Sequence, residues 1–234
     1  MTPAEYDRAI VTISKDKLAT LPVAEYRGKL KVIDSLSQIE GAVSDLNKAK
    51  IIGFDTETRP SFKKGMYYNV ALIQLATKEC CYLFRTNIIG YPKELIEILD
   101  NPDILKVGLS IHDDFHSLRK VTEIDPQGFI DLQTFVKDYR IADNSLSRVY
   151  GILFGERISK SQRLTNWEAS ELSDAQQAYA ALDASSCIKI YDYLTQGKFN
   201  PEKSKYLTVP PEPVEEKICE ADEIEPSAEE KTNK

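Results

Sequence analysis

The apolar positions of this chain follow two spacings, one typical of strands and the other typical of helices. Short apolar runs predict strands at 29–34, 51–55, 70–76, 80–84, 104–109 and 129–132. Helical spacing predicts helices at 37–46 and 92–99 and a third helix that follows the strand at 104–109 and ends at 118. From 134 the pattern is mostly helical, with a long last helix at about 174–194. Three polar residues between the third and fourth strands suit a hairpin. Strands followed by helices predict an α/β fold, a mixed sheet with helices on its faces.

The composition is that of a globular protein, with 42% hydrophobic and 29% charged residues among 234. We divide the chain into an N-terminal strand–helix extension at 1–50, a main domain at 51–200 and an acidic, proline-containing tail at 201–234 that we expect to be disordered. No apolar run approaches the roughly 20 residues that span a bilayer. The first residues also lack a signal-peptide pattern, so we expect a cytoplasmic protein without a membrane partner.

The net charge of −7 is concentrated at the end of the chain. Nine acids and three lysines from Pro210 onward contribute −6, which leaves about −1 for the rest. The body is therefore nearly neutral and has room for local basic patches. The tail either contacts a basic partner or serves solubility.

The cysteines and histidines favour no metal site of their own. Four cysteines, Cys80, Cys81, Cys187 and Cys219, include no Cys-x-x-Cys pair, which argues against a zinc ribbon or a thioredoxin-type redox site. The adjacent Cys80 and Cys81 are interpreted as small strand residues of a reducing compartment. His112 and His116 have the i, i+4 spacing of zinc ligands on a helix, but no zincin glutamate accompanies them. Surface histidines are the preferred interpretation, and a histidine-based metalloenzyme is the alternative.

Acidic residues in three separated segments carry the candidate chemistry. Asp55 and Glu57 follow a buried run and are two apart on an extended segment, so both side chains leave the same face. Tyr179 and Asp183 are four apart on one face of the last helix, on its apolar line. A carboxylate on a buried line is costly unless a partner such as a cation compensates it. If the three segments come together in the fold, their carboxylates could hold two divalent cations for phosphodiester cleavage.

The third segment contains two adjacent acids that helical phase separates. If Ile111, Phe115 and Leu118 form the buried stripe of a helix, Asp114 lies beside that stripe and Asp113 points away from it. We therefore predict Asp114 as the inward ligand and Asp113 as a solvated residue.

The order of these motifs resembles the DEDD superfamily of 3′–5′ exonucleases, in its DEDDy branch, and most of all Werner-type exonuclease domains, with ribonuclease D more distant. The resemblance runs from Ile51 to Leu194. It includes Phe-Asp-Thr-Glu at 54–57, Val-Ala-Leu-Ile-Gln-Leu at 70–75, Lys-Val-Gly-Leu-Ser-Ile-His-Asp-Asp at 106–114 and Tyr-Ala-Ala-Leu-Asp at 179–183. Three motifs in order, with matching segments between them, make the resemblance specific.

The resemblance implies a ribonuclease H-like fold with a five-stranded mixed sheet between helices. It also implies that Asp55, Glu57, Asp114 and Asp183 hold two Mg²⁺ or Mn²⁺ ions while Tyr179 positions the attacking water. The expected reaction releases nucleoside 5′-monophosphates from the 3′ ends of DNA or RNA. Basic residues that could follow the phosphate backbone are Lys63, Lys64, Arg148 and Arg163. The alternative is a catalytically silent nucleic-acid- or protein-binding module on the same fold.

Overall fold

The computed structural model describes residues 2–211 of the chain. Its main sheet has six strands in the order β2-β5-β4-β3-β6-β7. The strands are β2 (Lys29–Ile33), β3 (Ile51–Thr58), β4 (Val70–Ala76), β5 (Cys80–Phe84), β6 (Leu105–Gly108) and β7 (Phe129–Asp131). β4 is antiparallel to β3 and β5, whereas β2–β5, β3–β6 and β6–β7 are parallel pairs. The predicted mixed sheet and the hairpin of β4 and β5 are confirmed.

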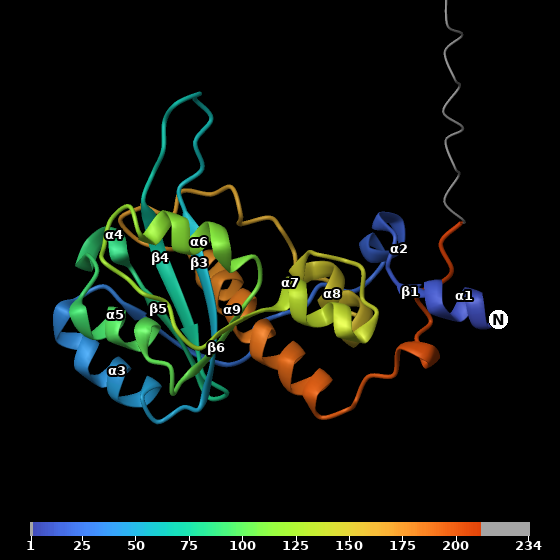
Figure 1. Cartoon of the computed structure of the whole chain (residues 1–234). Coiled ribbons are helices and arrows are strands. Elements are labelled where there is room, and N and C mark those ends of the chain that lie inside the picture. The colour runs from blue at the N-terminus through green and yellow to red at the C-terminus, as the bar shows by residue number, and fades with distance from the viewer. Residues whose placement is uncertain (1, 212–234) are drawn as a thin grey trace, which may run out of the picture.

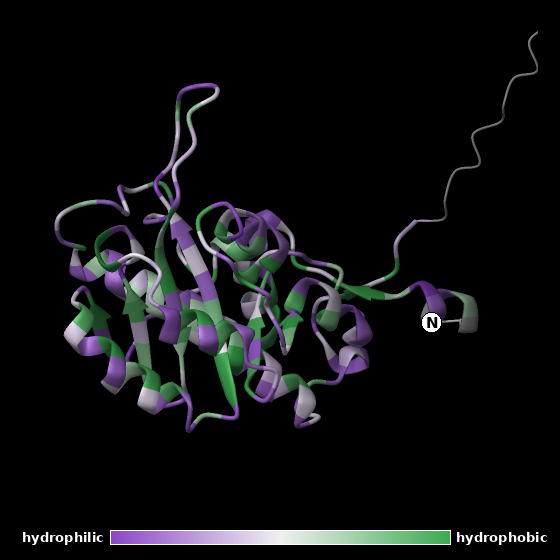
Figure 2. Ribbon diagram, turned by 60° about the vertical axis from the view of Figure 1, so that its left-hand side comes forward, coloured by the Kyte–Doolittle hydropathy of each residue, from purple (hydrophilic) through white to green (hydrophobic). Residues whose placement is uncertain are grey.

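Helices cover both faces of this sheet (Figure 1). One face packs against α3 (Ile39–Leu46), α5 (Lys93–Asp100) and α6 (Ile111–Leu118), in a cluster that includes Phe54 of β3. The opposite face packs against α9 (Asp174–Thr195). The other helices of this part are α4 (Thr86–Ile89), α7 (Leu132–Phe135), α8 (Leu146–Phe154) and the 3-10 turns η1 (Leu36–Gln38) and η2 (Val136–Tyr139). Figure 2 shows mostly hydrophobic strands between helices whose outer surfaces are largely hydrophilic.

The sheet has one strand more than the five that the resemblance implies. β2 pairs in parallel with β5, from Lys29 opposite Cys80 to Ile33 opposite Phe84. The run at 29–34 is predicted as a strand of the N-terminal extension that packs on the main domain, and the structure adds it to the edge of the sheet. Its addition satisfies backbone groups of β5 that would otherwise form an open edge.

The two ends of the described chain meet beside α8. The N-terminal part forms α1 (Pro3–Arg8), β1 (Ile10–Val11) and α2 (Lys15–Ala19), and the C-terminal part forms η3 (Pro201–Lys203) and β8 (Leu207–Thr208). β1 pairs antiparallel with β8. Regular structure therefore continues past residue 201, where the acidic tail was predicted to begin. Residues 212–234, including Cys219, lie outside the described residues, and the predicted disorder there stays a prediction.

Two further expectations concern the described residues as a whole. Cys80, Cys81 and Cys187 are buried free thiols, and Cys80 and Cys81 lie in β5, in agreement with their interpretation as strand residues. Between residues 2 and 211, no helix combines the length and the apolar character needed to cross a membrane.

β3 and α9 approach each other so closely at Gly53 that no side chain fits between them. A Cβ atom at this position would lie 1.9 Å from the backbone oxygen of Ala184. We therefore expect Gly53→Ala to lower the free energy of unfolding by about 3 kcal/mol or more, because a helix and a strand must separate to relieve the overlap. Urea denaturation followed by circular dichroism measures this loss.

Gly41→Ala is the matched control. Gly41 lies in α3, and a Cβ atom there would have nothing within 4 Å. Because alanine favours the helix interior, this variant should gain roughly 0.5–1 kcal/mol. Equal stability of the two variants would contradict the close approach of β3 and α9.

Candidate active site

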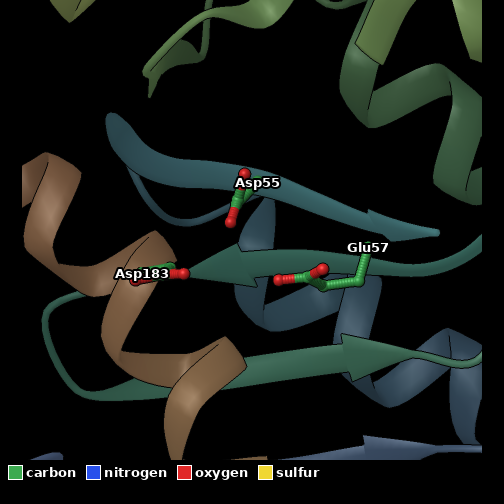
Figure 3. Close-up of side chains that lie close together, drawn as sticks. All are labelled: Asp55, Glu57 and Asp183. Atoms are coloured by element: carbon green, nitrogen blue, oxygen red, sulfur yellow. The ribbon is translucent and has the colours of Figure 1, made fainter. Parts of the chain in front are cut away.

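Three carboxylates from two distant segments converge where β3 lies against α9 (Figure 3). One oxygen atom of each of Asp55, Glu57 and Asp183 lies within 4.8 Å of the others. Asp55 and Glu57 are two residues apart on β3, so their side chains point to the same face of the strand. Gly53, two residues earlier on that face, contacts Ala184 of α9, so α9 covers this face. Asp183 belongs to α9 itself. The predicted approach of these acids is present in the structure.

Burial raises the pKa of all three acids in this cluster, and repulsion between carboxylates adds to the shift at Asp55 and Glu57. Burial raises the pKa of Asp55 well above its usual value, and the charges of Asp183, Glu57 and Asp114 raise it further. Burial also raises the pKa of Glu57 to about 9, with the charges of Asp183 and Asp114 adding to it and that of Arg163 opposing it. For Asp183, burial raises the pKa to about 7 against the opposing effects of Tyr179 and Lys160. Without a compensating charge, the ionised cluster is strained electrostatically.

The donor set of this cluster fits divalent metal ions. Glu57 and Asp183 are only 8% and 6% exposed, so solvent does little to stabilise their charges. All three groups offer carboxylate oxygen, which hard cations such as Mg²⁺ and Mn²⁺ prefer. A bound cation would supply the positive charge that the cluster lacks.

Asp114 reaches the site from the other side of β3. Its carboxylate accepts a hydrogen bond from the hydroxyl of Thr56, which stands between Asp55 and Glu57. Burial, with smaller contributions from Asp113 and Asp131, raises the pKa of Asp114 to about 7 against the effect of that hydrogen bond. Asp114 is not among the three acids that lie within 4.8 Å of one another. As helical phase predicts, Asp114 is half-buried and Asp113 is exposed.

The helix that carries Asp114 begins at a constrained turn. Ser110 has a φ of 65°, in the left-handed region that few residues other than glycine adopt. The carboxylate of Asp131, at the end of β7, accepts hydrogen bonds from the backbone N–H groups of Ser110 at 2.9 Å and Ile111 at 3.2 Å. Asp131 therefore holds the first turn of α6, and with it the position of Asp114.

Tyr179 lies one helical turn before Asp183, and the interaction with its hydroxyl lowers the pKa of Asp183. Burial and the nearby carboxylates of Asp183 and Glu57 raise the pKa of Tyr179 far above its usual value. Its ring stands beside Trp167, with centroids 6.1 Å apart. Trp167 is fully buried in the core. The phenol is therefore neutral at physiological pH and held in a fixed place.

Two further residues beside the acids, Thr56 and Gln74, were not predicted from the sequence. Gln74 of β4 is paired with Asp55 across the antiparallel ladder, so the two side chains share one face. It is fully buried, and neither its amide nitrogen nor its amide oxygen has a hydrogen-bond partner. A single amide residue in the otherwise apolar strand Val70–Ala76 was a signal that pointed to it. The contact of Thr56 with Asp114 could not be predicted without knowing that α6 packs on β3.

A cavity of about 310 Å³ opens onto the acids and has basic side chains on its wall. Lys160 and Arg163 line it together with Asp55, Glu57 and Asp183. Their positive charges are exposed and face buried acids. A phosphate group entering this cavity would meet cations beside the carboxylates.

The other predicted basic residues lie outside this cavity. Lys63 and Lys64 are exposed in the loop between β3 and β4. Arg148 forms an ion pair of 2.7 Å with Asp143, which also accepts a hydrogen bond from the backbone N–H of Ile13. Arg148 therefore helps to anchor the N-terminal segment, and its predicted contact with nucleic acid stays a prediction.

The histidine alternative gains nothing from the structure. His112 and His116 are both exposed on α6. Within residues 2–211, the group of side chains close enough to share a metal ion consists of Asp55, Glu57 and Asp183 and contains no histidine.

Comparison with known proteins identifies the family that the sequence matches. A family model described as "3'-5' exonuclease" matches residues 30–197. A bifunctional 3′–5′ exonuclease/ATP-dependent helicase WRN of Mus musculus is 30% identical over 184 residues, which are 74% of this chain and 13% of that protein. The chain thus spans a small part of this relative's length.

Solved structures share the fold. The Nibbler EXO domain of Aedes aegypti superposes with a TM-score of 0.68 at 24% identity, covering 77% of this chain and 96% of that one. Ribonuclease D of Trypanosoma brucei, in complex with RNA U12, superposes with a TM-score of 0.66 at 21% identity, covering 75% of this chain and 65% of that one. These similarities support the predicted ribonuclease H-like arrangement of a mixed sheet between helices.

Proposed function

The chain belongs to the 3′–5′ exonuclease family, and from this premise we propose that it hydrolyses phosphodiester bonds at the 3′ ends of nucleic acids. The observation that carries the proposal is the buried cluster of Asp55, Glu57 and Asp183, with carboxylate oxygens within 4.8 Å of one another. Asp114, bound to Thr56 beside the cluster, completes the four acids. We propose that these acids hold two Mg²⁺ or Mn²⁺ ions.

Such ions, when bound, lower the pKa of a water nucleophile and stabilise charge on the phosphate and the leaving 3′ oxygen. The protein's own residues then have defined tasks. Tyr179 keeps its proton because its pKa is raised, so its Oη can position the attacking water by a hydrogen bond but cannot act as a base. Lys160 and Arg163 on the cavity wall attract the phosphate. The products are a nucleoside 5′-monophosphate and a strand shorter by one residue.

The substrate is proposed at the level of nucleic acid. The family relative from mouse is named an exonuclease and helicase, and the ribonuclease D neighbour is described in complex with RNA. Lys63, Lys64 and Arg163 are exposed and available to the phosphate backbone. A cytoplasmic location and a basic partner for the acidic tail remain predictions from the sequence.

A degradation assay on 5′-labelled single strands tests the proposed function. Matched DNA and RNA oligonucleotides should yield a ladder of products that shorten from the 3′ end in Mg²⁺ or Mn²⁺ and no products in EDTA. The rates of degradation of the DNA and RNA oligonucleotides then show whether deoxyribose or ribose is preferred. A protein that binds both strands but produces no ladder with either metal would be the silent module instead.

Tyr179→Phe separates positioning of the water from binding of the substrate. We expect kcat to fall about 100-fold with little change in KM, because only the hydroxyl beside Asp183 is removed while the ring stays beside Trp167. Steady-state kinetics on a labelled strand measures both constants. Tyr191→Phe is the matched control, since Tyr191 lies on the same helix but packs against Phe135. Similar losses in both variants would refute the role of Tyr179.

A further inference from the structure

The loop between β3 and β4 projects from the molecule (Figure 1). A second pocket lies between this loop and the segment that contains Leu164. Its volume is about 420 Å³. Its wall combines aromatic, aliphatic and cationic side chains, chiefly Arg59, Phe62, Lys63, Met66, Tyr68 and Leu164. Of its lining residues, only Lys63 is among the basic residues predicted to contact nucleic acid.

The pocket continues from the proposed active site along two segments of chain. On β3 and the loop after it, Glu57 lines the acidic cavity and Arg59 lines the pocket. On the segment before α9, Arg163 lines the cavity and Leu164 lines the pocket. An ion pair of 3.2 Å between Arg59 and Glu168 connects the two segments. A strand that leaves the acidic cavity can therefore enter the pocket directly.

The side chains of the pocket are unusually exposed for their type. Phe62 is 82% exposed and Leu164 is 59% exposed. Both contribute to the pocket from different segments, so their exposure forms one surface rather than scattered positions. Neither side chain belongs to a hydrophobic cluster of the core, so both offer apolar surface to a ligand.

The cations around this surface select the chemistry of that ligand. The guanidinium group of Arg59 lies 4.8 Å from the ring centre of Tyr68, and Lys63 lies on the same wall. Aromatic and aliphatic faces beside Lys and Arg suit unpaired bases joined by phosphates. The ion pair of Arg59 with Glu168 compensates both charges, so Lys63 supplies the net positive charge of this wall. The surface thus attracts an anionic strand with flat apolar groups.

We propose that this pocket, named here the base pocket and lined by Arg59, Phe62, Lys63, Tyr68 and Leu164, binds the unpaired bases that precede the scissile phosphate. The proposal rests on the proposed exonuclease function and extends it, because it assigns the path of the strand beyond the terminal nucleotide. A pocket of this kind makes the enzyme select 3′ ends that are single-stranded over several nucleotides.

The double variant Phe62→Ala/Leu164→Ala tests the base pocket in the full chain. Both residues are exposed, so the fold should tolerate the change. We expect KM on a 12-nucleotide single strand to rise about tenfold, because stacking surface for bases is lost. Hydrolysis of a nucleoside 5′-monophosphate p-nitrophenyl ester, which has a single base, should not change. The Kd for the same 12-mer, measured by fluorescence anisotropy in EDTA, should also rise about tenfold.

Leu36→Ala is the matched control, since Leu36 is 65% exposed and lies in η1, outside the lining of the pocket. Its KM and Kd should equal those of the wild type. Equal KM and Kd in the double variant would overturn the base pocket and assign its surface to another ligand, such as a protein segment. Weaker binding by the double variant, with a wild type that degrades no strand, would support the pocket and refute the proposed function.

Discussion

Asp183→Asn is expected to lower kcat by about 1,000-fold or more and to stabilise the metal-free protein. Asparagine keeps the shape of the side chain but removes a charge that the proposed cations require. The same charge is unfavourable without metal, because Asp183 is only 6% exposed and lies within 4.8 Å of Asp55 and Glu57. In EDTA at pH 8, its removal should therefore raise the melting temperature by several degrees. Single-turnover degradation of a labelled strand and thermal denaturation measure the two effects.

The opposite signs of these two effects identify a functional site, since a residue that merely supports the fold would lose both activity and stability. Asp113→Asn is the matched control, because it removes a carboxylate that is exposed on α6. It should change kcat by less than about twofold and leave the melting temperature nearly unchanged. An active Asp183→Asn enzyme would refute the assignment of Asp183 as a metal ligand.

Removal of divalent metal is expected to abolish activity and to make the protein less stable as the pH rises. The pKa of Asp114 and of Asp183 is raised to about 7 and that of Glu57 to about 9, whereas the unfolded chain has ordinary values near 4. Between these limits the folded state binds more protons than the unfolded state. The free energy of unfolding therefore falls as pH rises from about 4 through 7 and towards 9. In EDTA, the melting temperature should be higher at pH 5 than at pH 8.

Addition of Mg²⁺ should oppose this fall. Metal binds the ionised acids of the folded state, so its stabilising effect grows as the acids lose their protons. The difference in melting temperature between samples with 10 mM Mg²⁺ and with EDTA should be small at pH 5 and several degrees at pH 8. Because both samples are compared at the same pH, groups that titrate elsewhere in the protein affect both melting temperatures equally and cancel in the difference. A constant difference across the pH range, or one that shrinks with pH, would contradict a cation site at these acids.

The local pattern of the sequence was sufficient for much of the site. The spacing of Asp55 and Glu57 on a strand determined that both side chains share a face, and the structure has them so. Helical phase separated Asp114 from Asp113, and the structure buries Asp114 in part while it exposes Asp113. These predictions succeed because they need only the geometry of one element.

Contacts between elements far apart in the chain were beyond such reasoning. The bond between Thr56 and Asp114 joins residues 58 positions apart, and the place of Gln74 opposite Asp55 depends on the register of β4. The base pocket likewise joins the loop after β3 to the segment before α9. Periodicity carries no information on which elements pack together, so these features had no local signal that specified them.

The sequence by itself therefore determined the strands of the main sheet, the long last helix, the family resemblance and the five candidate residues of the site. Tertiary structure decided the sixth strand of the sheet, the pairing of the two ends of the chain and the distances among the acids. The physical reason is that side-chain direction within a strand or helix is a local property of the backbone. Which strand meets which helix depends instead on packing, such as the contact of Gly53 with Ala184 that brings β3 and α9 together.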